Sequence, residues 1–179
     1  MTKETHARGG TIFSLILLPF ISNQILTNYN IIYKLILIII YIYFSYLGSL
    51  FPDIDMKGSY ISKKFGYLHK LFGKHFRHRG FTHSLLFLIL LNILQNFLLN
   101  YSENNIVFIL LSKGFIIGYS SHILLDLITK EGVELIYPIQ INFSLLPIKT
   151  SSKTEKLIYK TFNFFIVFLL GYRFFILFQ

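Results

Sequence analysis

Residues His78-Arg79-Gly80-Phe81-Thr82-His83-Ser84 join the most basic segment of the chain to a long run of leucines. This heptad holds two imidazoles, a guanidinium, two hydroxyls and a flexible glycine. Ionisable side chains at the border of an apolar segment cost free energy unless they bind something, so they usually mark a functional site. We therefore expect residues 78–84 to anchor such a site.

The composition is that of an integral membrane protein. Of the 179 residues, 54% are hydrophobic and only 14% are charged, whereas about a quarter of the residues in a soluble protein are charged. The mean hydropathy is +0.59. The length suits one domain covering residues 1–179. Because no cysteine is present, any transition metal must be held by imidazole and carboxylate groups.

Five apolar runs predict an all-α, polytopic membrane helical bundle with about four to five transmembrane helices, because about 20 apolar residues suffice to cross a bilayer. The first run contains Pro19 and could also form part of a signal peptide. Since no small-x-small cleavage site follows it, we expect a retained helix. Residues 56–77 form a basic loop that should carry one short amphipathic helix near residues 61–72. The runs cover residues 11–26, 31–50, 84–99, 106–128 and 157–178.

The positive charge follows the expected topology. The net charge is +9, and of the 17 lysines and arginines seven lie in residues 57–79 and five in residues 130–160. A cytoplasmic amino terminus and five spans would put residues 53–83 and 129–156 in the cytoplasm, as the positive-inside rule requires. We expect a multi-pass protein of the bacterial inner membrane whose basic residues meet membrane lipids rather than nucleic acid.

The acidic and imidazole side chains gather at this predicted cytoplasmic boundary. All three aspartates and four of the six histidines lie there, on four separate segments. Such residues at membrane depth are rare and usually functional. His69 and His75 lie in the basic loop and are interpreted as loop residues. The predicted metal ligands are His6, Asp53, Asp55, His78, His83, His122 and Asp126.

The spacing within these segments supports the prediction. His122 and Asp126 are four residues apart, so they share one helix face, as a pair of metal ligands requires. Gly118, one turn earlier, would let a neighbouring helix or a substrate approach, and Thr129, one turn later, would support the ligands by hydrogen bonding.

Two shorter motifs would supply the other ligands. Asp53 and Asp55 point the same way if their stretch is extended. In the heptad, Thr82 is expected to cap the following helix, which leaves His83 in its first turn.

Each of these residues also has a plainer explanation when it is considered alone. Their joint position on one membrane face nevertheless favours a metal site. The alternatives are a helix end facing water for Asp53 and Asp55, headgroup contact for His78 and His83, a buried hydrogen-bonded pair for His122 and Asp126, and an incidental surface position for His6.

Nitrogen and oxygen ligands without thiolate suit Zn²⁺ best among the expected ions, with Mn²⁺ or Fe²⁺ as alternatives. Seven ligands exceed the needs of one tetrahedral ion, so a site with one or two ions is expected. In a two-ion site an aspartate bridges the ions and a shared water is the nucleophile. Arg79 would suit a phosphate group. The implied chemistry is metal-assisted hydrolysis, most naturally of a phosphoester.

Four motifs occur in order within residues 5–138, and residues 78–84 are the most specific of them. The motifs are Thr5-His6, Pro52-Asp53-Ile54-Asp55, the heptad, and Gly118-Tyr119-Ser120-Ser121-His122-Ile123-Leu124-Leu125-Asp126-Leu127-Ile128-Thr129, followed by Gly132 and Pro138.

This set resembles the YdjM family, described as LexA-binding, inner-membrane-associated, metal-dependent hydrolases. The resemblance implies a membrane-bound hydrolase but does not fix its substrate. The order of ligands is more distantly similar to zinc-dependent phospholipases C and zinc nucleases, which hold three zinc ions. Their further His-x-x-x-Glu pair has no counterpart here.

The expected catalytic roles follow. Asp53 or Asp55 would bridge metals or orient the attacking water, and Arg79 would stabilise developing negative charge on a phospholipid or other phosphoester substrate. The expected hydrogen-bond donors to the ligands are Thr82, Ser84 and Ser121.

Two other functions stay open at this point. A non-catalytic membrane adaptor would bind a protein partner through the basic loop at residues 56–79. A metal transporter or sensor would need ligands at mid-membrane depth, and the second and third apolar runs hold none.

Overall fold

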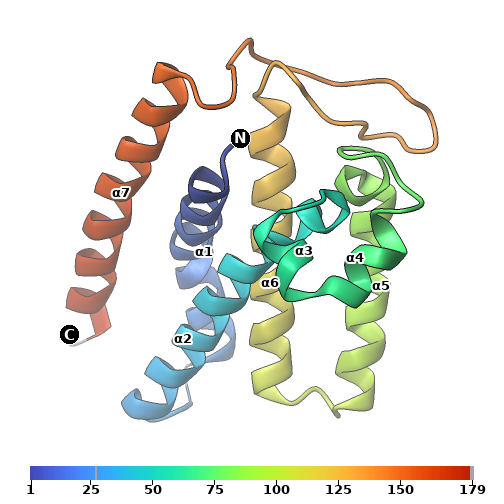
Figure 1. Ribbon diagram of the computed structural model, residues 1–179. Coiled ribbons are helices and arrows are strands. Elements are labelled where there is room, and N and C mark those ends of the chain that lie inside the picture. Colours follow the sequence, from blue (N-terminus) through green and yellow to red (C-terminus); the bar gives the residue numbers. More distant parts are fainter. Residues whose placement is uncertain (27, 178–179) are drawn as a thin grey trace.

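The computed structural model describes residues 1–26 and 28–177, and within these ranges it is an all-helical bundle with two isolated β-bridges (Figure 1). The predicted all-α class is confirmed. The helices are α1 (Lys3–Ile25), α2 (Ile31–Gly48), the 3₁₀ helix η1 (Phe51–Asp55), α3 (Tyr60–Lys64), α4 (Gly66–Phe72), the 3₁₀ helix η2 (Phe81–His83), α5 (Leu85–Tyr101), α6 (Ile106–Leu127) and α7 (Lys153–Leu177).

Each of the five apolar runs forms a long helix. Among the described residues, α2, α6 and α7 are long and apolar enough to cross a membrane, and α5 is a shorter apolar helix. The outward faces of α5 and α7 expose large apolar side chains such as Phe97 and Val167, which suits contact with lipid. Phe178, at the end of the last predicted run, lies outside the described residues.

Helix α1 begins well before its apolar run. It starts at Lys3 rather than Thr11, and Thr2 precedes it in an extended conformation. Glu4 in the first turn interacts favourably with the positive end of the helix dipole. The earlier start makes His6 part of the helix and buries it against α6.

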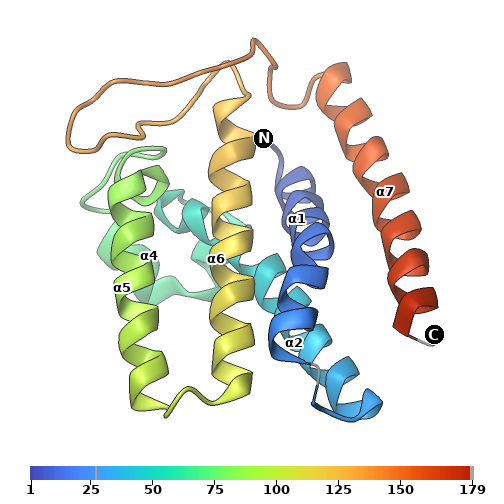
Figure 2. The same cartoon turned by 180° about the vertical axis from the view of Figure 1, so that it is seen from behind.

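Helix α6 lies at the centre of the bundle, with α2, α1 and α5 packed around it, whereas α7 packs on the outer side of α1 (Figures 1 and 2). Glycines bring α2 and α6 close together. A methyl group added to Gly114 would meet the carbonyl oxygen of Tyr41, and one added to Gly118 would meet that of Ser45. Small residues permit this close approach of membrane helices, so the predicted role of Gly118 is confirmed.

The basic loop between α2 and α5 differs from its prediction. Instead of one amphipathic helix near residues 61–72, it contains α3 and α4. The break lies at Phe65, whose backbone (φ −119°, ψ 59°) leaves the helical region. Because Gly66 follows, the chain restarts as a separate helix after this bend.

The segment from residue 128 to residue 152 crosses over the same end of the bundle as the basic loop (Figure 1). The backbone of Glu134 donates a hydrogen bond to the carbonyl of Arg79, and that of Leu85 donates to the carbonyl of Leu135. These bonds tie the segment to the heptad and hold Glu131 close to Arg79.

Candidate metal centre

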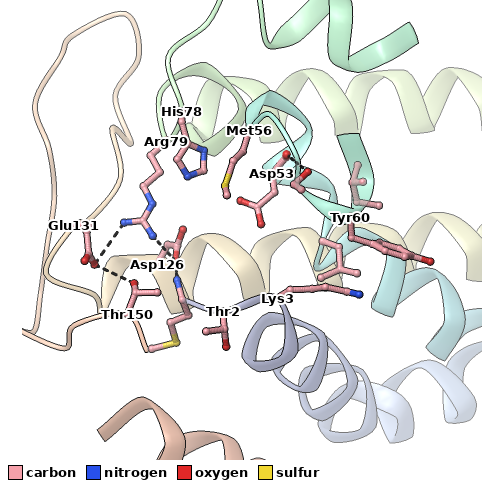
Figure 3. A pocket seen from close by; sticks show the side chains of 14 residues that line it. Thr2, Lys3, Asp53, Met56, Tyr60, His78, Arg79, Asp126, Glu131 and Thr150 are labelled. Carbon is pink, nitrogen blue, oxygen red and sulfur yellow. Dashed lines mark hydrogen bonds and ion pairs between the residues drawn. The ribbon is translucent and has the colours of Figure 1, made fainter. Parts of the chain in front are cut away.

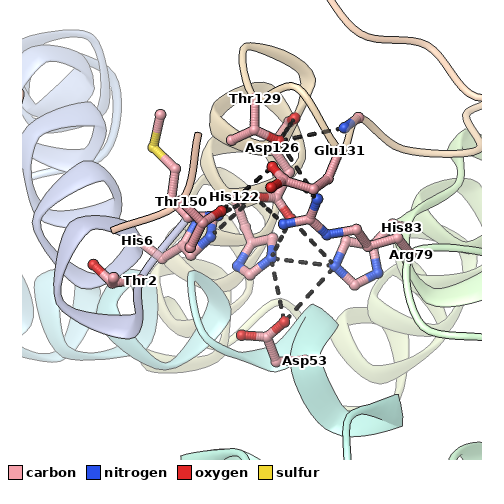
Figure 4. Close-up of polar contacts among 12 residues, drawn as sticks. Thr2, His6, Asp53, Arg79, His83, His122, Asp126, Thr129, Glu131 and Thr150 are labelled. Atoms are coloured by element: carbon pink, nitrogen blue, oxygen red, sulfur yellow. Dashed lines mark hydrogen bonds and ion pairs between the residues drawn. The ribbon is translucent and has the colours of Figure 1, made fainter. Parts of the chain in front are cut away.

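The predicted ligands converge at the end of the bundle where α1 begins and α6 ends (Figure 4). Two groups of donor atoms, each lying within 4.8 Å of one another, suit a metal ion in the described part of the chain. They come from α1, η1, the heptad and α6. The groups are His6 with His122 and Asp126, and Asp53 with His78 and His83.

At the centre of the site, two imidazoles face each other. Nε2 of His83 lies 3.2 Å from Nε2 of His122, and both side chains are fully buried. Nδ1 of His122 lies 2.7 Å from the backbone carbonyl oxygen of Ser49. A carbonyl only accepts hydrogen bonds, so Nδ1 carries the proton and a neutral ring keeps a lone pair on Nε2.

The tautomer of His83 follows from a similar chain. The Thr82 hydroxyl donates to a carboxylate oxygen of Asp55 at 2.6 Å. Having used its proton, this hydroxyl accepts from Nδ1 of His83, which is 3.0 Å away. The Nε2 lone pair of His83 therefore also points to the shared centre. Burial lowers the pKa of His83, which favours the neutral ring at pH 7.

Two carboxylates complete the centre. Oδ1 of Asp53 lies 3.7 Å from Nε2 of His122 and 3.9 Å from that of His83. The corresponding distances from Oδ2 of Asp126 are 3.5 Å and 3.8 Å. A tetrahedral zinc site with bonds of about 2.0–2.1 Å has ligand atoms roughly 3.3–3.4 Å apart. These four side chains therefore fit a four-coordinate ion after small adjustments.

His6 extends the cluster on the side of α1. Its ring stacks on that of His122 with centroids 3.6 Å apart, and its Nε2 lies 3.2 Å from Oδ1 of Asp126. The side chain is buried, and its Nδ1 has no hydrogen-bond partner. An incidental surface position for His6 is therefore excluded.

Asp53 and Asp55 point to different partners, so the predicted extended stretch is wrong. The 3₁₀ helix η1 rotates the two carboxylates apart: Asp53 faces His122 and His83, whereas Asp55 lies 2.9 Å from Nδ1 of His78. Burial would raise the pKa of Asp55, but the neighbouring imidazoles of His78 and His83 outweigh it and hold the pKa below its usual range. Asp55 is thus an ionised group that orients the histidines.

The predicted supporting hydroxyls divide in the same way. Thr82 contacts Asp55, but it does not cap α5. Ser84 is the cap, and it accepts a hydrogen bond from the backbone of Phe87. Ser121 donates to a carbonyl within α6. Neither serine hydroxyl donates to a ligand. The predictions for Ser84 and Ser121 are therefore wrong, as is the placement of His83 inside α5.

Arg79 reaches the cluster from the heptad with a left-handed backbone (φ 66°). Its guanidinium lies 3.4 Å from Oδ1 of Asp126 and 3.4 Å from the hydroxyl of Thr129. Thr129 thus acts on the site through Arg79. Glu131, 3.8 Å away, is a further partner of Arg79. Sequence reasoning missed Glu131, although it lies two residues after Thr129.

A cavity of about 600 Å³ opens beside the cluster (Figure 3). Asp53, His78, Arg79 and Asp126 line it, and Lys3 adds a positive charge. Its volume is typical of small-molecule sites, which range over roughly 300–1,000 Å³. The amino group of the first residue also lies here, 2.6 Å from Asp126. The cluster is thus accessible to a small ligand.

Comparisons with known proteins give a consistent result. A family model described as YdjM inner membrane protein matches residues 1–179. The uncharacterized protein YvsG of Bacillus subtilis is 38% identical over 113 residues, which cover 63% of this chain and 66% of that protein. The inner membrane protein YdjM of Escherichia coli is 38% identical over 111 residues, covering 62% of this chain and 55% of that protein. No solved structure matches the chain.

Proposed function

The chain belongs to the YdjM inner membrane protein family, and on this premise we propose that it is a membrane-bound hydrolase that depends on a divalent metal. The observation that carries the proposal is the facing pair of Nε2 atoms, 3.2 Å apart. Two neutral imidazoles whose lone pairs meet at one point repel each other unless a cation or a shared proton lies between them. A metal ion satisfies both lone pairs at once.

Four side chains would hold the ion: His83, His122, Asp53 and Asp126. Imidazole and carboxylate ligands in a four-coordinate arrangement favour Zn²⁺, with Mn²⁺ or Fe²⁺ as alternatives. His6 and His78 flank this set on opposite sides and would serve a second ion. Thr82 and the carbonyl of Ser49 fix the ring orientations, which is how outer hydrogen bonds support metal ligands.

The chemistry is hydrolysis of a phosphoester. A bound divalent ion supplies Lewis acidity and makes water a stronger acid. Asp53 lines the cavity and is the more exposed of the two central carboxylates, so it is suited to orient an entering water and accept its proton. Arg79 would neutralise charge that develops on a phosphoryl oxygen.

The substrate class follows from the surroundings of the cavity. Lys3 and Arg79 line it, and the basic residues of the loop lie in the adjoining segment. Cations at a membrane border attract anionic headgroups. We therefore assign a phospholipid or another lipid-linked phosphoester as substrate, bound at the cytoplasmic face. A cytoplasmic reporter signal from a fusion after Lys64 would support this orientation, and a periplasmic signal would contradict it.

A transporter is less well supported than a hydrolase. In the described residues, the groups suited to a metal gather at one end of α6 rather than at mid-depth. A hydrolytic site needs only access from one side, which the cavity provides.

The test is hydrolysis of bis(p-nitrophenyl) phosphate and of phosphatidylglycerol by the purified full-length protein. Activity should disappear with a chelator, return with Zn²⁺ or Mn²⁺, and be absent in Asp53→Asn. His75→Ala is the matched control, because this histidine is exposed and lies in the basic loop. Metal-loaded protein that hydrolyses neither compound would contradict the proposed phosphoesterase.

A further inference from the structure

A second cavity, of about 420 Å³, lies between α1, α5 and α6. The side of the bundle formed by these helices is seen in Figure 2. The cavity is unusual for a membrane bundle because half of the residues that line it are polar. They are Gln24, Asn92, Gln95, Asn96, Ser112 and Lys113.

The cavity lies in the half of the bundle away from the metal cluster. Lys113 is seven residues from the start of α6, or roughly 10 Å along the helix axis. His122 and Asp126 lie at the other end of the same helix. Since the hydrocarbon core is about 30 Å thick, these polar groups lie at membrane depth. Amide and ammonium groups at that depth require partners.

Ser112 gives an independent indication of a ligand. Its side chain is only 2% exposed, and its hydroxyl has no hydrogen-bond partner. Buried hydroxyls are normally hydrogen-bonded, because an unpartnered one costs free energy. Ser112 lines the cavity, so a polar group bound there would satisfy it.

The charge and shape of the lining define the ligand. Among the described lining residues, Lys113 carries the only formal charge, which calls for an anion. The carboxamides of Gln95 and Asn96 and the Ser112 hydroxyl add donors. The apolar side chains of Leu17 and Phe20 on the wall would contact a hydrocarbon chain.

From these features we propose that the cavity binds an anionic phospholipid, with the headgroup phosphate on Lys113 and Ser112 and an acyl chain along α1. A hollow bounded by three helices of one chain suits a lipid better than the flat face of a second copy. The site is separate from the metal cluster, and the proposal does not depend on catalysis.

The test is native mass spectrometry of the full-length protein in detergent, titrated with dioleoyl phosphatidylglycerol or dioleoyl phosphatidylcholine. The native protein should retain phosphatidylglycerol selectively. Lys113→Gln should weaken this retention about tenfold, as expected for the loss of one charge-assisted hydrogen bond, and Ser112→Ala should weaken it less. Lys34→Gln, at the start of another span, is the matched control and should retain the lipid normally.

Three outcomes would overturn the proposal. Equal retention by Lys113→Gln and Lys34→Gln would show that Lys113 does not bind the headgroup. Equal retention of the two lipids would exclude an anion site. Displacement of phosphatidylglycerol by millimolar inorganic phosphate would indicate a site for free phosphate instead. A size-exclusion profile identical to that of the native protein verifies that each variant is folded.

Discussion

Nε2 of His83 lies 3.2 Å from Nε2 of His122, although the two residues are 39 positions apart in the chain. Each ring is held by a hydrogen bond at Nδ1, from His122 to the Ser49 carbonyl and from His83 to the Thr82 hydroxyl. The protein therefore fixes two lone pairs on one point before any ion arrives. Such preorganisation is what a tight metal site requires.

Thr82→Val tests the relay from Asp55 to His83. The substitution keeps the shape of the side chain but removes the hydroxyl that orients His83. Zn²⁺ affinity should fall by about 10- to 100-fold, as is typical when an outer-shell partner of a ligand is lost. Competition with a chromophoric chelator measures it. Thr11→Val is the control, since Thr11 bonds only a carbonyl of its own helix among its described partners. Equal affinities in the two variants would exclude the relay.

Asp55→Asn tests the charge at the base of that relay. The pKa of Asp55 is held below its usual value, so the ionised group stabilises the fold above the unfolded-state pKa, and this contribution is lost as the pH falls through the folded-state pKa. In metal-free protein, the native chain should unfold at a higher temperature than Asp55→Asn at pH 6. The gap should narrow as the pH falls below about 4. A gap that widens in acid would contradict the assignment.

Gly118→Ala tests the contact between α2 and α6. The added methyl group would meet the Ser45 carbonyl, and overpacking of this kind costs about 1–3 kcal/mol. Thermal unfolding should therefore occur at a lower temperature. Gly171→Ala, in α7, is the matched control because a methyl group there has no neighbour within 4 Å. It should unfold at or slightly above the native temperature, since alanine favours helices.

Neutralising the basic loop separates a hydrolase from an adaptor. Replacing Lys63, Lys64, Lys70 and Lys74 by glutamine should leave hydrolysis of bis(p-nitrophenyl) phosphate unchanged, because the catalytic side chains stay in place. Hydrolysis of phosphatidylglycerol vesicles should decrease, because the attraction to an anionic surface is weaker. If instead His83→Ala and Asp126→Ala retain the function in cells and the loop variant loses it, the adaptor is the correct description.

The sequence predicted the class of fold and the neighbourhood of the site, because both depend on periodic patterns. The apolar runs predicted the helices, and the spacing of His122 and Asp126 predicted their shared face. The structure also brings His6, from the other end of the sequence, against this pair. Whether these residues bind a metal stays a prediction.

The finer assignments depended on backbone geometry that the residue pattern does not specify. The 3₁₀ turn at Asp53 and Asp55 could not be distinguished from an extended stretch. Thr82 and Ser84 are both good helix caps, and only the fold decides between them. The carbonyl of Ser49 left no trace in the sequence, because any residue provides one.

The central claim is tested most directly by elemental analysis of the purified full-length protein and of its His122→Ala/Asp126→Ala variant, with His75→Ala as the control. We expect at least one equivalent of zinc, manganese or iron in the native protein and in His75→Ala. The double variant should retain none, because it lacks two of the four central ligands. Equal metal content in the native protein and the double variant would contradict the metal centre.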